Sequence, residues 1–300
     1  MARFSTRVLA PIFGAFALLG IAGCASQLML NPGIARLAEA LDPTPSFEER
    51  EQAQDVMVRN DRGALLHGLL FSSATDRGTA LVSGGNTMSR LQVLYYYRFL
   101  LGRGFRVLAF SFQGFDDNEG DADLGSLLGD AAAFYSDVRR RFPHDHVTYV
   151  AHSISTSAAL CLPARVPGID GLVLEGTVDP EAIPYSKLKQ LWYLFPLYPV
   201  LVPIAVAVSR TVPKELHVTD CLAEYHVVPI LFIHYPSDDV TPFDAALRLF
   251  GVYAGPAEFI VPLQSRRPQY HMSMWADVAV QESVVAFVKR VLDGQNLATF

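Results

Sequence analysis

Short, almost wholly apolar runs alternate with segments of helical spacing along most of this 300-residue chain. Runs of this kind, each followed by a helix, are typical of strands buried on both faces of a parallel sheet. The expected strands are residues 79–82, 105–110, 147–150, 171–176 and 228–234. The expected helices are residues 91–101, 125–142, 245–250 and 275–292, with another starting near residue 156. The sequence therefore predicts an α/β fold, with helices covering both faces of a mostly parallel sheet.

A hairpin is expected ahead of this alternation. Residues 55–58 and 64–71 are strand-like, and residues 59–63 between them carry turn-forming Asn, Asp and Gly. We see no internal repeat, and we assign residues 55–300 to one domain. The net charge of −6 gives no reason to expect a nucleic-acid partner, and no Lys/Arg run supports one.

The N-terminus has the pattern of a targeting segment. Arg3 and Arg7 precede an apolar run over residues 8–21, which is too short for a comfortable transmembrane helix. The run ends in Ile-Ala-Gly-Cys24, which resembles a bacterial lipobox; a secretory signal with an incidental cysteine is the alternative. We expect residues 1–23 to be a lipoprotein signal peptide, Cys24 to be acylated and residues 24–54 to form a membrane tether. Ala25, rather than Asp, favours the outer over the inner membrane of a bacterial envelope.

Cys161 and Cys221 are the other two cysteines, too few for a disulfide scaffold. In an oxidising compartment they could pair. Because Cys161 falls in a helix expected to pack under the sheet, we favour two buried apolar thiols over a disulfide.

Residues 191–208 are uncharged and long enough for a transmembrane helix, but Pro196, Pro199 and Pro203 argue against a regular one. They also lie between two expected sheet strands. We interpret them as part of a cap insertion over about residues 178–220. Two readings of this segment stay open: a pair of core helices, or an apolar cap that contacts lipid or an acyl chain.

Ser153 lies at the turn between an expected strand and an expected helix, flanked at its second neighbours by the small residues Ala151 and Ser155. Such a serine has the pattern of a nucleophile elbow, in which a strained, exposed hydroxyl can attack a substrate carbon. A simple helix N-cap is the alternative. Ser155 is a weaker nucleophile candidate, because its strand would end late.

The order of the remaining candidates supports the elbow. Asp238 follows the strand 228–234, and His271 precedes the last helix. Ser, Asp, His is the chain order of the α/β-hydrolases, and the sequence resembles that superfamily over roughly residues 55–295.

More closely, the chain resembles small serine hydrolases in which an early apolar strand ends at a His-Gly-Asn type loop. Their Arg-Gly-Tyr-Gly-x-Ser-Glu-Gly turn corresponds to residues 113–120, and their Asp-x-Val-x-Pro motif to residues 238–242. This register makes Asp238 the acid and Asp239 the second choice. The chain departs from the pattern at Ser83, Ala151, Ser155 and Tyr235, where His or Gly is usual. We expect Tyr235 to narrow the site.

The resemblance implies a role for each candidate. His271 would accept the Ser153 proton, and Asp238 would orient and stabilise the imidazolium. The backbone N–H groups of Ile154 and Gly85 would form the oxyanion hole, with Asn86 as the alternative to Gly85. Of the remaining histidines, we expect His152 and His234 to be structural, and His144 and His146 to flank a surface turn. No metal-ligand spacing is present, and no cofactor is expected.

These observations predict a lipid-anchored serine hydrolase that cleaves a carboxylic ester or thioester of a small-molecule acyl substrate. The apolar cap and the lipid anchor favour a lipophilic acyl group. The alternative is a non-catalytic envelope lipoprotein that binds an apolar ligand or partner in a degenerate hydrolase cleft.

Overall fold

The computed structural model describes residues 52–73, 76–86, 88–190, 192–238, 240–262, 271 and 277–294. The expected signal peptide, Cys24 and nearly all of the expected tether lie outside these residues.

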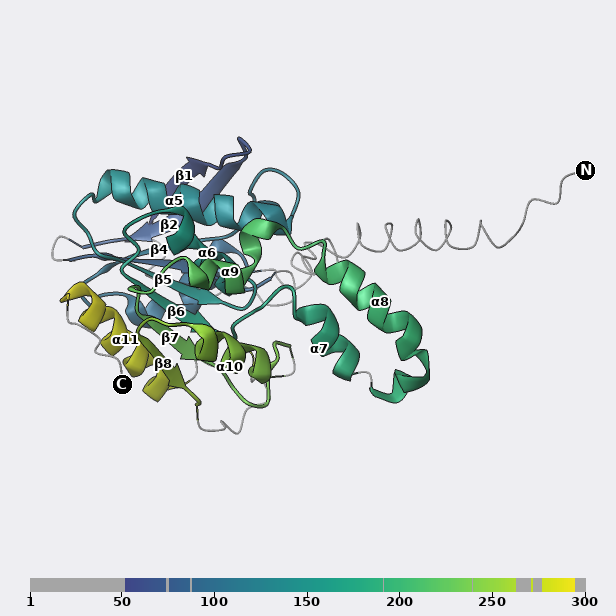
Figure 1. The fold of residues 1–300 in the computed structure, drawn as a ribbon. Helices are drawn as coiled ribbons and strands as arrows, with labels where there is room; N and C mark the ends of the chain where they lie inside the picture. Colours follow the sequence, from purple (N-terminus) through teal and green to yellow (C-terminus); the bar gives the residue numbers. More distant parts are fainter. Residues whose placement is uncertain are drawn as a thin grey trace, which may run out of the picture.

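One eight-stranded sheet forms the centre of the molecule, in the order β1-β2-β4-β3-β5-β6-β7-β8 (Figure 1). The hairpin strands β1 and β2 are antiparallel, β2 is antiparallel to β4, and every later pairing is parallel. This arrangement confirms the predicted mostly parallel α/β sheet. The strands are β1 (Gln54–Arg59), β2 (Leu65–Phe71), β3 (Thr79–Ser83), β4 (Arg106–Phe110), β5 (Val147–His152), β6 (Gly171–Glu175), β7 (Ile230–Ile233) and β8 (Ala257–Ile260).

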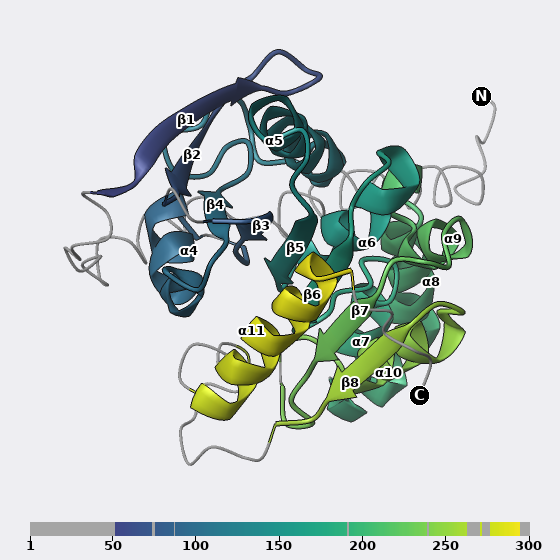
Figure 2. The same cartoon turned by 90° about the vertical axis from the view of Figure 1, so that its left-hand side faces the viewer.

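Helices cover both faces of the sheet (Figure 2). The helices α4 and α11 pack on one face, in a core that contains Val93, Val150 and Phe287. The helices α5, α6, α9 and α10 pack on the other face, where Phe134, Leu160 and Leu249 are buried. Their bounds are α4 (Arg90–Tyr96), α5 (Leu127–Arg141), α6 (Ser155–Arg165), α9 (Val218–Ala223), α10 (Phe243–Val252) and α11 (Val278–Leu292), with short 3-10 turns η1 (Arg98–Leu100) and η2 (Leu124–Ser126).

The segment between β6 and β7 is helical. It contains α7 (Ile183–Gln190), η3 (Trp192–Leu197), α8 (Tyr198–Ser209) and η4 (Lys214–Leu216), followed by α9. In Figure 1, α7 and α8 form a pair that projects away from the sheet and its covering helices. Within the part of the chain that the structure describes, no helix is both long and apolar enough to cross a membrane.

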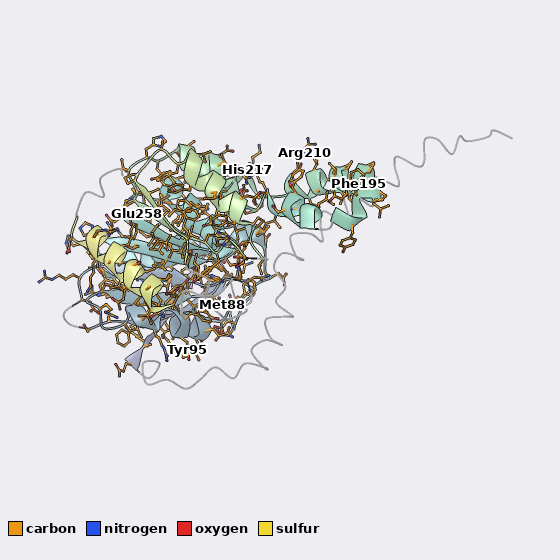
Figure 3. The ribbon with its side chains drawn as sticks, turned by 90° about the horizontal axis from the view of Figure 1, so that it is seen from below. Met88, Tyr95, Phe195, Arg210, His217 and Glu258 are labelled. Carbon is orange, nitrogen blue, oxygen red and sulfur yellow. A yellow bond between two sulfur atoms is a disulfide. The ribbon has the colours of Figure 1, made fainter. Side chains whose placement is uncertain are left out.

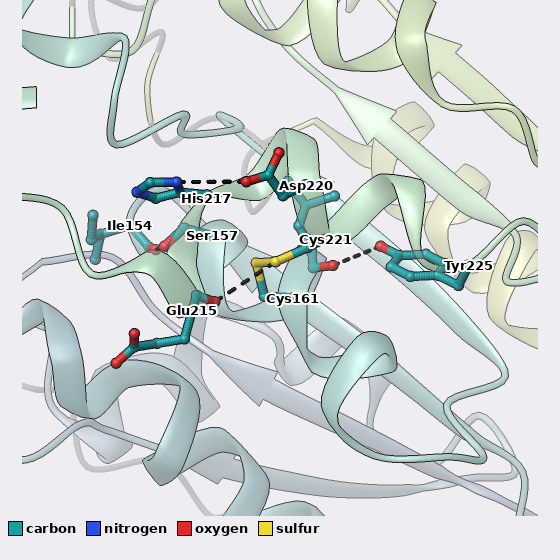
Figure 4. Close-up of a disulfide and its surroundings, with 9 residues drawn as sticks. Ile154, Ser157, Cys161, Glu215, His217, Asp220, Cys221 and Tyr225 are labelled. Carbon is teal, nitrogen blue, oxygen red and sulfur yellow. Dashed lines mark hydrogen bonds and ion pairs between the residues drawn. A yellow bond between two sulfur atoms is a disulfide. The ribbon is translucent and has the colours of Figure 1, made fainter. Parts of the chain in front are cut away.

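Two features differ from the sequence-based expectations. Strand β8 was not predicted, because it is only four residues long and its side chains are all partly exposed. The expectation of free thiols at Cys161 and Cys221 is wrong: their Sγ atoms are bonded, 2.06 Å apart (Figure 4). Both cysteines are buried, as expected, but α9, which carries Cys221, packs directly against α6 and so brings the two sulfur atoms together.

Candidate active site

Ser153 lies on a strained turn between β5 and α6. Its φ of 56° is in the left-handed region, which few non-glycine residues adopt. The Ser153 N–H donates to the carbonyl of Glu175 at the end of β6, 2.9 Å away. The sheet therefore holds the backbone of this residue, and the turn has the conformation of a nucleophile elbow.

Ser155, which stands where a glycine is usual, closes the turn. Its Oγ accepts the His152 N–H (3.0 Å) and donates to the His152 carbonyl (2.8 Å). The side chain is fully buried. The Ser155 hydroxyl is therefore occupied by backbone groups. This residue, the alternative nucleophile, stabilises the turn.

The structure brings Ser153, Asp238 and His271 together from three separate segments of the chain. His271 Nε2 lies 2.9 Å from Ser153 Oγ, and His271 Nδ1 lies 2.8 Å from Asp238 Oδ2. The carboxyl ends of the parallel strands β5 and β7 meet at one edge of the sheet, which explains why the elbow and the acid loop are neighbours. The distances are those that transfer of a proton from a serine to an oriented imidazole requires.

Glycine at position 176, just after β6, leaves room for this imidazole. A Cβ built on Gly176 would lie 3.2 Å from His271 Cε1, and its φ of 60° would strain any other residue. The ring therefore sits directly over the backbone at the end of β6.

Asp238 is held by four hydrogen bonds. Its Oδ1 accepts the N–H groups of Val240 and Thr241, both at 2.8 Å. Its Oδ2 accepts the Thr241 hydroxyl at 2.7 Å, beside the contact with His271. Burial alone raises the pKa of this carboxyl, but the interactions with His271 and Thr241 outweigh it and lower the pKa to about 2. The group is therefore a carboxylate at any physiological pH.

Thr241 was not identified from the sequence. Its only signal was its position three residues after the acid, where a hydroxyl can turn back to a carboxylate in a tight loop. Asp239, the second choice for the acid, lies outside the described residues.

His234 is fully buried beneath the acid loop, in the structural position we expected. Its Nε2 lies 3.0 Å from the Thr241 carbonyl and 3.6 Å from Asp238 Oδ2. Burial lowers the pKa of His234, so the neutral imidazole is favoured there.

The two candidate oxyanion donors flank Ser153. Ile154 forms the start of α6, where N–H groups have no helical partner. A Cβ on Gly85 would lie 3.1 Å from Ser153 Cβ and 3.0 Å from His152 Cδ2, so the loop after β3 passes directly over the serine. The Gly85 N–H itself donates to Met88 Sδ at 3.2 Å. A thioether is a weak acceptor, and a developing oxyanion would compete with it easily.

His152 has a partner that the sequence did not reveal. Its Nδ1 lies 3.0 Å from Glu175 Oε2, and both side chains are about 5% exposed. The His152 ring packs against the His271 ring, with centroids 4.8 Å apart. The sequence did contain one indication of a buried partner: Glu175 is the last residue of the otherwise apolar strand β6.

Two of the residues that depart from the usual hydrolase pattern are buried. Ser83 is buried at the end of β3, where its Oγ lies 2.8 Å from the Tyr149 hydroxyl. Tyr235 is 2% exposed, so its ring is packed into the protein. Among the described side chains, no group of three or more His, Cys, Asp or Glu residues could hold a metal ion.

The sheet order, the elbow after β5 and the helices on both faces define an α/β-hydrolase fold of the esterase type. The esterase Pf2001 of Pyrococcus furiosus has this fold: it superimposes with a TM-score of 0.65 at 17% identity, over 83% of this chain and 95% of that chain. No protein-family profile matches the sequence.

Curated proteins with similar sequences include a lipase and a protein of unassigned function. The lysophosphatidylserine lipase ABHD12 of Xenopus tropicalis is 23% identical over 206 residues, which are 66% of this chain and 50% of that protein. An uncharacterized protein of Mycobacterium tuberculosis is 26% identical over 224 residues, covering 73% of this chain and 74% of that protein. The chain thus matches only about half of the length of the frog lipase.

Proposed function

We propose that this protein is a serine hydrolase that cleaves a carboxylic ester or thioester through Ser153, Asp238 and His271. The observation that carries the proposal is the continuous contact from Asp238 through His271 to Ser153 Oγ, at 2.8 and 2.9 Å. The left-handed backbone of Ser153 costs conformational energy. A functional reason for this cost is that the turn places the hydroxyl against His271.

In the proposed reaction, His271 Nε2 takes the Ser153 proton as Oγ bonds to the acyl carbon. The carbonyl π electrons move to the oxygen, and the N–H groups of Ile154 and Gly85 stabilise the resulting oxyanion. Asp238 holds the imidazole by Nδ1 and stabilises its positive charge.

Collapse of the tetrahedral intermediate breaks the bond to the leaving alcohol or thiol, which receives the proton from His271. The acyl group remains on Ser153 Oγ as an ester. Water then attacks this ester, and His271 accepts a proton from it. The carboxylic acid leaves, and Ser153 Oγ receives that proton from His271.

We further propose a lipophilic acyl substrate. The similarity to a lysophosphatidylserine lipase supports an ester of a lipid, and so does the uncharged apolar stretch over residues 191–208. We also propose, from the lipobox-like sequence alone, that Cys24 carries the acyl anchor and that the protein resides in a bacterial envelope, on the outer rather than the inner membrane.

A series of p-nitrophenyl esters from acetate to palmitate, with matching thioesters, tests this proposal. We expect hydrolysis that depends on acyl length and is abolished by Ser153→Ala. Ser283→Ala is the matched control, because this serine is partly exposed on α11 and its hydroxyl donates to the Ala279 carbonyl (2.8 Å). Equal activity of the wild type and Ser153→Ala on every ester would refute the proposal.

A further inference from the structure

The end of the projecting α7–α8 pair exposes large apolar side chains. Four of them are 53 to 72% exposed and lie within eight residues of one another: Tyr193 (61%), Phe195 (72%), Leu197 (53%) and Val200 (62%). We call residues 192–202 the apolar tip. Single exposed apolar residues are common on soluble proteins, but a contiguous group with aromatic members marks an interaction site.

The apolar tip stands apart from the hydrolase core. Figure 3 shows Phe195 at the far end of the projection, with Arg210 nearer the body of the molecule. The pair is braced internally, since the Tyr198 hydroxyl donates to the Leu188 carbonyl (2.9 Å) and Ser209 Oγ donates to the Glu181 carbonyl (2.7 Å). The exposed side chains are thus presented on a fixed support.

The charged residues that flank the apolar tip in the sequence have one sign. Between Glu181 and Glu215 the chain has no acidic residue and four basic ones, although the whole protein has a net charge of −6. The four are Lys187, Lys189, Arg210 and Lys214. Exposed apolar and aromatic side chains in a segment flanked by basic residues are the combination that binds the acyl boundary and the anionic headgroups of a bilayer.

We propose that the apolar tip inserts into the surface of a lipid bilayer that contains anionic headgroups. The sequence ahead of the described domain agrees with a bilayer as the partner. Residues 8–21 are an apolar run, and residues 25–51, if fully extended, would span up to ~90 Å. A domain anchored at Cys24 through a segment of this length would stay close enough for the apolar tip to contact the bilayer. The docking surface does not depend on hydrolysis, and a catalytically inactive variant would retain it.

Fluorescence quenching in the full chain tests the proposal. Trp192→Phe and Trp275→Phe remove both native tryptophans, and Phe195→Trp then places a single fluorophore in the apolar tip. Met57→Trp in the same background is the matched control, because Met57 is 60% exposed on β1, outside the projection. The vesicles contain phosphatidylcholine and phosphatidylglycerol with brominated acyl chains.

We expect brominated vesicles to quench the Phe195→Trp variant at least twofold more than the Met57→Trp variant, and to quench it less without phosphatidylglycerol. Equal quenching of the two variants would overturn the proposal. A blue-shifted emission of Phe195→Trp without vesicles would also overturn it. If that shift grows with protein concentration, the occupant is a second copy; if it does not, the occupant is the chain's own N-terminal segment.

Discussion

His152 and Glu175 form a buried pair directly beside the imidazole of His271. The His152 Nδ1 atom is 3.0 Å from Glu175 Oε2, and the His152 and His271 rings are 4.8 Å apart. Glu175 also binds the backbone of the elbow, because its carbonyl accepts the Ser153 N–H. One residue at the end of β6 thus positions both the serine and a ring that packs on the proposed base.

Glu175→Gln is expected to lower kcat about tenfold with little change in KM, since it disturbs the ring beside His271 but leaves the proposed reacting groups in place. It should also lower the free energy of unfolding by about 1–3 kcal/mol, because His152 exchanges a buried carboxylate partner for a neutral amide, which is a weaker one. Steady-state kinetics and urea denaturation measure both effects. The control is Asp220→Asn, which removes an exposed partner 3.6 Å from His217 and should change neither quantity. An unchanged kcat in folded Glu175→Gln would refute this positioning role.

Gly85→Ala should reduce kcat by about 10- to 100-fold, because the added methyl group would lie 3.1 Å from Ser153 Cβ and crowd the proposed oxyanion site. Gly251→Ala is the matched control. A Cβ at Gly251, in α10, meets no atom within 4 Å, so this change should leave activity intact and raise stability slightly. Ester hydrolysis by the two purified variants distinguishes these outcomes, and full activity of Gly85→Ala would contradict the assigned oxyanion loop.

The disulfide joins α6, which follows the proposed nucleophile, to α9, which ends the helical segment after β6. It links residues 60 positions apart. Closing a loop of this length stabilises a folded chain by about 4 kcal/mol. The double variant Cys161→Ala, Cys221→Ala should lose about that much unfolding free energy in chemical denaturation. A reductant should destabilise the wild type but not the double variant, and equal stability of wild type and variant would contradict the bond.

Asp130 gives the protein a pH-dependent stability. Burial raises the pKa of this carboxyl to about 6, although hydrogen bonds from Asn60 (2.7 Å) and the Gln113 N–H (2.8 Å) oppose the shift. Below about pH 4 the group is protonated in both folded and unfolded chains. As pH rises from there to about 6, the unfolded chain releases its proton and the folded chain retains it, so stability falls by up to about 3 kcal/mol.

Asp130→Asn removes this titration. Its unfolding free energy should be lower than that of the wild type at about pH 4, because an amide cannot accept both hydrogen bonds, and the difference should shrink towards pH 7. Denaturant titrations at several pH values measure it. A difference that is constant over this range would show that the Asp130 carboxyl titrates normally when folded.

The sequence predicted the architecture and the convergence of the three site residues because both follow from local patterns. Apolar runs identify buried strands, and groups placed after parallel strands meet at one edge of the sheet. Strand β8 lacked such a pattern, since Ala257–Ile260 is short and partly exposed and contains Glu258.

Contacts between distant side chains could not be predicted in the same way. The pairing of Cys161 with Cys221 depends on how α9 packs on α6, and spacing along the chain carries no information about that. Likewise, the sequence shows that Glu175 ends an apolar strand, but it does not identify the partner of this carboxylate. The strand register determines that partner, because it places His152 of β5 opposite Glu175 of β6.

Fluorophosphonate labelling of the full chain, with the modified residue located by mass spectrometry, tests the central claim most directly, because only an activated serine reacts. We predict a single label on Ser153, no label in Ser153→Ala, and labelling slowed roughly 100- to 10,000-fold in His271→Ala. A folded wild-type protein that stays unlabelled, or is labelled as fast without His271, would contradict the account.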